Sequence, residues 1–115
     1  MNAIPGDIVL LSIPQLGGGK PKLRPALVLA QLPGPYQSLL VCGISSQLEA
    51  AEDGWDEVIE AGQDVFAATG LRKSSVVRLS YLYAADSNEL EGRIGSIPSD
   101  LLAKLKARLA GLFQS

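Results

Sequence analysis

Apolar residues occur along this chain in short runs separated by glycine and proline, a pattern typical of β-strands joined by turns. The runs that predict strands cover residues 8–13, 24–31, 38–45, 57–60, 75–79 and 91–95. The Pro-Gly-Pro at 33–35 predicts a turn between the second and third strands, which would form an antiparallel meander. Short strands with this punctuation favour a small barrel over a doubly wound sheet.

The C-terminal segment has a different period. Its apolar residues recur at helical spacing, at Leu101, Leu102, Leu105, Leu109, Leu112 and Phe113. Pro98 suits the first turn of a helix, and Asp100 complements the positive N-terminal dipole. We therefore predict a mainly β fold with a C-terminal α-helix packed on the barrel, in one domain spanning residues 1–115. A helix on a membrane surface is the less favoured alternative, because any helix docked on a core shows one apolar stripe.

Charge is distributed unevenly, although the formal net charge is only −2. That balance argues against a protein that coats nucleic acid through bulk charge. Basic residues nevertheless gather in two places, namely Lys20, Lys22 and Arg24, and then Arg72, Lys73 and Arg78. Acidic residues occupy the stretch 49–60 between them. If folding joins the two basic clusters they form a local anion groove, and otherwise they are solvated loop charges.

The chain has no histidine and one cysteine, Cys42. It therefore lacks the usual general base and the commonest metal ligand, and one thiol cannot form a zinc site. Cys42 lies in an apolar run, where a thiol packs as a small hydrophobe rather than acting as a nucleophile. We expect chemistry without metal or cofactor, or no chemistry.

No apolar run approaches the roughly 20 residues that a bilayer requires. The N-terminus also lacks a basic segment followed by an apolar one, so no export signal is visible. The expectation is a soluble, cytoplasmic protein.

Arg24-Pro25 is the first candidate for chemistry, because it precedes a buried-type strand and follows a glycine-rich basic loop at 17–22. A guanidinium held on a rigid element can bind phosphate through two parallel hydrogen bonds. The alternative is an arginine that closes one end of a barrel with a carboxylate.

Several blocks, in their order and spacing, resemble the PemK/MazF-like toxins of bacterial type II toxin-antitoxin systems. They are Pro-Gly-Asp-Ile-Val-Leu-Leu at 5–11, Lys-Leu-Arg-Pro-Ala-Leu-Val-Leu at 22–29, Ile-Ser-Ser-Gln at 44–47, the segment 69–79, and the closing helix. The resemblance implies an SH3-like small barrel (PemK/MazF/CcdB-like) and a homodimer. It further implies metal-independent, sequence-selective cleavage of single-stranded mRNA through 2′-hydroxyl attack, which arrests growth, and a cognate antitoxin as partner.

Carried over by position, the resemblance implies catalytic roles for Arg24, Ser45 and Arg78. Arg24 would stabilise charge on the phosphorane, and Ser45 would donate a hydrogen bond to the scissile phosphate. The competing interpretation of Ser45 is a hydroxyl that caps the following turn. Arg78 could equally pair with a carboxylate such as Glu57 or Glu60. The expected RNA-binding residues are Lys20, Lys22, Ser46, Gln47, Arg72 and Lys73.

The chain departs from the family where many members carry a glutamate or histidine before the Arg-Pro, since it has Gly18, Gly19 and Lys20 there. The general base is therefore not identified. Either a carboxylate such as Asp7 approaches from elsewhere, or the reaction is slow. Aromatic side chains that could stack on bases, or pack at the barrel edge, are Tyr36, Trp55, Tyr81 and Tyr83.

Two functions from different classes follow. The first is an endoribonuclease toxin. The alternative is a catalytically degenerate member that binds RNA or antitoxin, or a toxin that inhibits a protein target such as gyrase, and the missing acidic and histidine positions favour it.

Overall fold

The computed structural model describes residues 2–13 and 22–115. Within them the strands are β1 (Asp7–Ile13), β2 (Lys22–Gln31), β3 (Ser38–Ser45), β4 (Glu57–Ile59), β5 (Ser75–Asp86) and β6 (Leu90–Ser96). The helices are α1 (Phe66–Thr69) and α2 (Ser99–Gln114), with single 3₁₀ turns at Leu48–Ala50 and Ser87–Glu89. The predicted mainly β fold with a C-terminal helix is confirmed.

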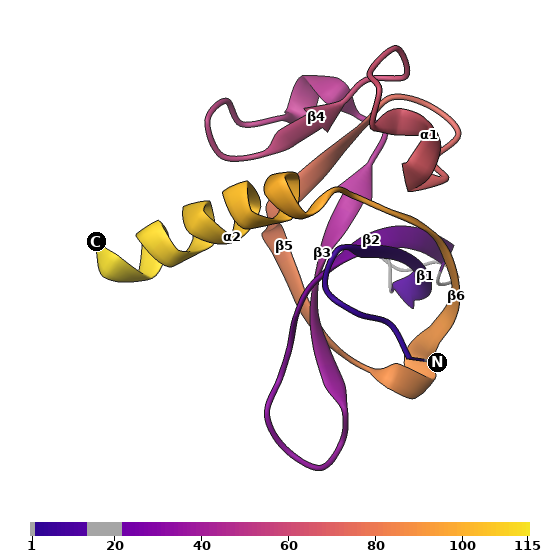
Figure 1. Ribbon diagram of the computed structural model, residues 1–115, viewed down its shortest axis with the longest axis vertical. Helices are drawn as coiled ribbons and strands as arrows, with labels where there is room; N and C mark the ends of the chain where they lie inside the picture. The colour runs from indigo at the N-terminus through magenta and orange to yellow at the C-terminus, as the bar shows by residue number, and fades with distance from the viewer. Residues whose placement is uncertain (1, 14–21) are drawn as a thin grey trace.

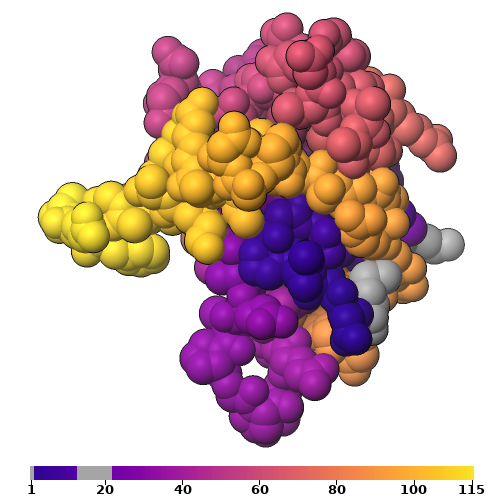
Figure 2. Space-filling model, viewed as in Figure 1, coloured from indigo at the N-terminus to yellow at the C-terminus, as the bar shows by residue number. Residues whose placement is uncertain are grey.

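The strands form one curled antiparallel sheet in the order β4-β5-β3-β2-β1-β6 (Figure 1). The predicted meander β1-β2-β3 is present, and its 33–35 turn joins β2 to β3 in a hairpin that projects from the body (Figures 1 and 2). Strand β5 then pairs with β3, and the short β4 lies outside β5 at the edge. This order puts the start of β2, the end of β3 and the start of β5 at the same end of the sheet.

Strand β5 is longer than predicted, because it continues past Leu79 to Asp86. Its pairing with β3 contains a bulge: Leu82 lies opposite Cys42, whereas Arg78 lies opposite the next residue, Gly43. Residues 79–81 are thus extra residues in β5, and such bulges bend a strand and redirect its side chains. The stretch 80–84 is exposed throughout, so no alternation marks it as a strand in the sequence.

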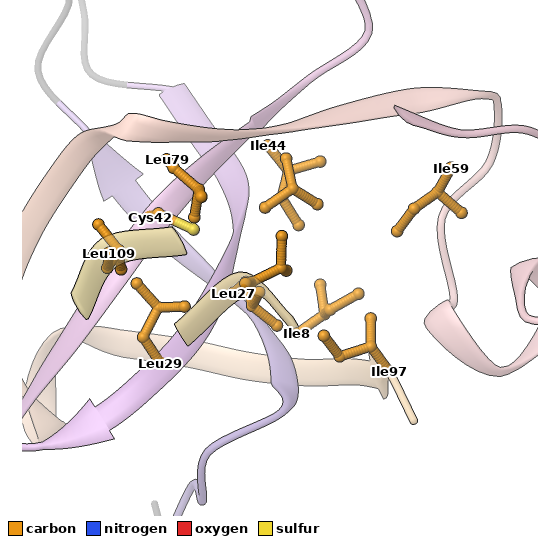
Figure 3. Packing of buried hydrophobic residues seen from close by; sticks show 11 residues of the cluster. Ile8, Leu27, Leu29, Cys42, Ile44, Ile59, Leu79, Ile97 and Leu109 are labelled. Carbon is orange, nitrogen blue, oxygen red and sulfur yellow. The ribbon is translucent and has the colours of Figure 1, made fainter. Parts of the chain in front are cut away.

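Both faces of the central strands are buried, against two apolar clusters. In β2 the side chains of Leu27 and Leu29 enter the larger cluster, whereas Ala26 and Val28 enter the smaller. Helix α2 completes the larger cluster with Leu105 and Leu109, and Leu109 lies over Leu29 and Cys42 in Figure 3. The helix is therefore packed on the sheet as predicted. Its last turn extends beyond the body, where Leu112 and Phe113 are exposed (Figure 1).

Two glycines allow the segment around α1 to pack closely on β6. Gly70 ends α1 in the left-handed conformation with φ 73°, and an added Cβ there would collide with the carbonyl of Ile94. A Cβ on Gly95 would collide with the backbone of Thr69. This contact attaches the 60–74 connection to the opposite edge of the sheet.

Candidate functional site

Arg24 lies near the start of β2, opposite Leu11 of β1, and is exposed. Four buried residues, Ala26–Leu29, follow Pro25 on the same strand. The buried strand expected after Arg24-Pro25 is therefore present. Lys20, one of the predicted RNA-binding residues, lies outside the described residues.

Ser45 is the last residue of β3 and pairs with Val76 of β5. Its Oγ accepts a hydrogen bond of 3.1 Å from the backbone N–H of Gln47, so the predicted turn-capping contact is present. That bond uses an oxygen lone pair and leaves the hydroxyl proton free for donation. Capping and donation to a ligand are therefore compatible.

The strand register places Arg24, Ser45 and Arg78 on one face of the sheet. Ala26 pairs with Gly43, and Gly43 pairs with Arg78, so these positions share a face. Arg24 and Ser45 lie two residues from Ala26 and Gly43 along their strands and point to that same face. Since neighbouring strands lie about 4.8 Å apart, the backbones of β2 and β5 are roughly 10 Å apart here. The three predicted catalytic residues are thus brought together.

The other predicted RNA-binding residues lie at the same end of the sheet. Lys22 is exposed at the start of β2, and Ser46 and Gln47 are exposed directly after β3. Arg72 and Lys73 are exposed just before β5, whose Val76 is paired with Ser45. The described members of the two basic clusters therefore lie at the same end of the sheet.

Arg78 has a buried partner that the sequence did not indicate. Its Nε lies 3.1 Å from Oδ2 of Asp56, and the side chains of Arg78 and Asp56 are 17% and 1% exposed. The Nε–H does not point along this line, so the contact is an ion pair rather than a well-formed hydrogen bond. Glu57, one of the two partners considered from sequence, instead pairs with Lys104 and Arg108 of α2.

Asp56 is fixed by backbone donors as well. Its Oδ1 accepts from the N–H of Leu79 at 3.0 Å, and its Oδ2 accepts from the N–H of Glu52 at 2.9 Å. The neighbouring Trp55 donates from Nε1 to Oγ of Ser80 at 2.9 Å. The loop 52–56 thus holds residues 78–80 at the β5 bulge through three side-chain contacts.

Helix α2 holds this loop from its other side. Nη1 of Arg108 donates to the carbonyls of Trp55 and Asp56 at 3.0 and 3.2 Å, and its Nη2 lies 3.2 Å from Glu57. Nothing in the sequence marks Asp56 and Arg108 beyond the acidic stretch and the basic face of the helix. Asp56 and Arg108 come close to the site only because the chain folds, through the contacts of the 52–56 loop.

Tyr81 lies over Gly43 at the centre of this face. A Cβ added to Gly43 would lie 3.5 Å from the Cβ of Tyr81. The tyrosine therefore lies on the side of β3 to which a side chain at position 43 would project. The guanidinium carbon of Arg78 stacks 4.4 Å from the ring centroid, which is cation–π geometry. Tyr81 is nevertheless 58% exposed.

Asp7, considered from the sequence as a possible general base, lies away from Arg24 along β1. It begins β1, whereas Leu11, nearer the other end of that strand, is the residue opposite Arg24. Its Oδ1 accepts from Nε of Arg93 at 2.9 Å, and its Oδ2 accepts from the N–H of Ile4 at 3.0 Å. This buried carboxylate fixes the N-terminal turn.

Cys42 is buried between β2 and β5, as predicted. Burial, reinforced by the negative charge of Asp56, raises the pKa of its thiol to about 12. Since the thiolate is the nucleophile, the protonated thiol is unreactive at neutral pH.

A hollow of about 320 Å³ lies between the N-terminal segment and the base of the β2-β3 hairpin, lined among others by Asn2, Gln31, Ser38 and Ser87. It lies at the start of β3, and Ser45 ends the strand. The hollow is therefore remote from Ser45 and Arg24, at the opposite end of these strands. Within the described part of the chain, no group of three or more metal-ligating side chains is present, and no helix is long and apolar enough to cross a bilayer.

Solved structures with the same fold include MazF from Deinococcus radiodurans, with a TM-score of 0.69 and 24% identity over 100% of this chain and 99% of that one. A MazE-MazF structure from the same organism has a TM-score of 0.67 and 24% identity, covering 98% and 96% of the two chains. The Mycobacterium tuberculosis toxin MazF-mt6 has a TM-score of 0.67 and 18% identity, covering 94% and 96%. No curated protein matches at a significant level.

At these identities the structures establish the fold alone. The family model for the PemK-like, MazF-like toxins of type II toxin-antitoxin systems matches residues 4–113, which is nearly the whole chain. The resemblance inferred from the sequence blocks is confirmed: the chain belongs to the PemK-like, MazF-like toxin family of type II toxin-antitoxin systems.

Proposed function

We propose that this toxin is an endoribonuclease that cleaves single-stranded mRNA without a metal ion. The observation that carries the proposal is the placement of Arg24 and Ser45 on one face, at the same end of adjacent strands, with the exposed Lys22, Arg72 and Lys73 at that end of the sheet. Membership of the toxin family supports the proposal, because Arg24 and Ser45 are the residues that the sequence resemblance matches to the family's catalytic positions.

In the proposed reaction the ribose 2′-oxygen attacks the adjacent phosphorus while the bond to the 5′-oxygen of the next nucleotide breaks. The products are a 2′,3′-cyclic phosphate and a 5′-hydroxyl end. Negative charge develops on the non-bridging oxygens, where the Arg24 guanidinium and the Ser45 hydroxyl act as preorganised donors. Each such donor contributes on the order of 3 kcal/mol to the stability of a transition state.

Proton removal from the 2′-hydroxyl is not assigned to a side chain. Asp7 is remote and Asp56 is buried in its ion pair. An arginine is protonated in proteins and does not act as a base in that form. A slow reaction is therefore expected, in which water or hydroxide accepts the 2′-hydroxyl proton and water supplies the proton to the departing 5′-oxygen. The predicted catalytic role of Arg78 remains a prediction, and its contacts favour support of Tyr81.

As a type II toxin the protein has a cognate antitoxin as its partner. We further propose a homodimer in the cytoplasm, in agreement with the family resemblance. The exposed apolar side chains of Leu82, Leu112 and Phe113 are available for such an interface. Sedimentation of the antitoxin-free protein measures the mass directly.

The test is incubation of the purified, antitoxin-free protein with a long single-stranded RNA in EDTA, followed by mapping of the new ends. We expect discrete cuts that disappear in Arg24→Ala and weaken at least tenfold in Ser45→Ala. Lys106→Ala, which removes an exposed charge from α2, is the matched control and should cut normally. Full cleavage by folded Arg24→Ala would contradict the proposal.

The second candidate is a non-catalytic toxin that binds RNA, antitoxin or a protein target. It is favoured by the absence of an assignable base. RNA that is bound but never cut, with affinity falling steeply as salt rises, would support its RNA-binding form. Growth arrest in cells whose RNA stays intact would support the protein-target form.

A further inference from the structure

The aromatic candidates differ in what holds them. Tyr36 is 77% exposed in the β2-β3 connection, which precedes β3 and so lies at the end of that strand remote from Ser45. Tyr83 donates from its hydroxyl to Glu89 at 2.8 Å, and it lies opposite Val41, farther from Ser45. Tyr81 alone among these three contacts Gly43, two residues from Ser45, and has a cation stacked on its ring.

The cation on Tyr81 is placed by a buried carboxylate. Asp56 is held by the N–H groups of Glu52 and Leu79, and it fixes the Nε end of Arg78. Because the charge of Arg78 is balanced by Asp56, the guanidinium is poorly suited to attract a phosphate. Its flat surface instead supports the tyrosine ring. The three residues form a layered unit, called here the Tyr81 stack: Asp56, Arg78 and Tyr81.

We propose that the Tyr81 stack is a base-stacking subsite for single-stranded RNA, in which Tyr81 contacts one base and Asp56 is a positioning residue that acts through Arg78. The ligand class rests on the proposed ribonuclease function. Single-stranded nucleic acid is bound by aromatic rings next to basic residues, and Arg24 lies on the same face two strands away. Tyr81 is 58% exposed, so part of its ring is available to a base.

The test uses a fluorescein-labelled 2′-O-methyl RNA octamer of mixed sequence, which cannot undergo 2′-hydroxyl attack, with binding followed by anisotropy. Stacking on an aromatic side chain contributes roughly 1–3 kcal/mol per base, so Tyr81→Ala should weaken binding about 5- to 150-fold. Tyr81→Phe keeps the ring and should bind within about threefold of the wild type. Tyr36→Ala removes a more exposed tyrosine and is the matched control.

Asp56→Asn tests the positioning role. Loss of the ordered cation–π contact should weaken octamer binding about 2- to 30-fold while Tyr81 is still present. In the double variant Asp56→Asn/Tyr81→Ala, no further loss beyond Tyr81→Ala is expected, because Asp56 acts only through the ring. If the losses in octamer affinity were additive, Asp56 would have a merely structural role, and the proposal that it positions Tyr81 through Arg78 would be wrong. Thermal unfolding of each variant confirms that binding is measured on folded protein.

The outcomes separate this inference from the function on which it rests. If the wild type cuts RNA but Tyr81→Ala binds the octamer normally, the subsite is wrong and the ribonuclease stands. If the octamer binds through Tyr81 and RNA is never cut, the subsite stands and the proposed reaction fails. A wild-type protein that neither binds nor cuts RNA overturns both.

Discussion

Arg24 and Arg78 face the same side of one sheet, yet their surroundings are opposite. Arg24 is exposed near the start of β2, next to Pro25, which precedes the buried part of the strand. The side chain of Arg78 is 17% exposed, paired with a buried carboxylate and stacked on a tyrosine. The same residue type therefore serves two purposes. The exposed guanidinium of Arg24 is available to bind a ligand. The guanidinium of Arg78 instead contacts Asp56 and Tyr81 and orders these residues.

Loss of Arg78 should produce the largest change in stability. Arg78→Met leaves Asp56 buried without its cation, which costs about 3 kcal/mol in the free energy of unfolding. Arg24→Met should change it by less than about 0.5 kcal/mol, because an exposed side chain is removed. Urea unfolding measures both. The double variant Asp56→Asn/Arg78→Met should regain part of the lost free energy of unfolding. Equal losses in Arg78→Met and Arg24→Met would show that the two arginines do not differ in their contribution to stability.

Replacement of Arg24 by lysine sharpens the functional side of the comparison. Arg24→Lys keeps the charge but loses the planar pair of donors that matches a phosphate. Cleavage of single-stranded RNA should fall about 10- to 100-fold, equivalent to roughly 1.4–2.8 kcal/mol of transition-state stabilisation. Initial rates in EDTA measure this effect. If Arg24→Lys cuts at the wild-type rate, a point charge suffices and the two-donor interpretation is wrong.

The link from α2 to the Arg78 region should have a smaller effect. Arg108→Met removes two hydrogen bonds to loop carbonyls and one contact with Glu57, so we expect a loss of about 1–2 kcal/mol in unfolding free energy. Lys104→Met is the matched control, since Lys104 also contacts Glu57 but is 54% exposed and should contribute under about 0.5 kcal/mol. The fluorescence of Trp55 reports whether the loop has moved. Equal losses would show that the carbonyl contacts are unimportant.

The sequence predicts the central strands well, because their apolar runs end at clear turn residues. Expected strands at 8–13, 24–31 and 38–45 correspond to β1, β2 and β3, whose bounds differ by at most two residues. The second half of β5 was missed because residues 80–84 are all exposed. Its strand conformation depends on pairing with β3, which is a tertiary effect that a local pattern does not contain.

The residues of the candidate site were likewise predicted only in part from the sequence. Arg24 and Ser45 were found because they end or begin strands in recognisable blocks. Asp56 was missed in favour of Glu57 and Glu60, since a run of acidic residues does not indicate which of them turns inward. The choice depends on backbone N–H groups from Glu52 and Leu79, and the second of these is distant in sequence. Contacts of this kind arise from the fold alone.

The smallest expected effect concerns the core thiol of Cys42, whose pKa is raised first by burial and then by the negative charge of Asp56. The folded pKa of Cys42 is raised to about 12 from an ordinary value of 9.0, so above pH 9 the unfolded chain releases a proton that the folded chain retains. Stability is therefore intact below pH 9 and declines as pH rises toward 12. At pH 9.5 the loss is about 0.8 kcal/mol relative to pH 7.5. Urea unfolding of wild type and Cys42→Ala at both pH values isolates this contribution, because other groups titrate alike in the two proteins. An unchanged difference between them would show that the thiol ionises as easily in the folded core as in the unfolded chain.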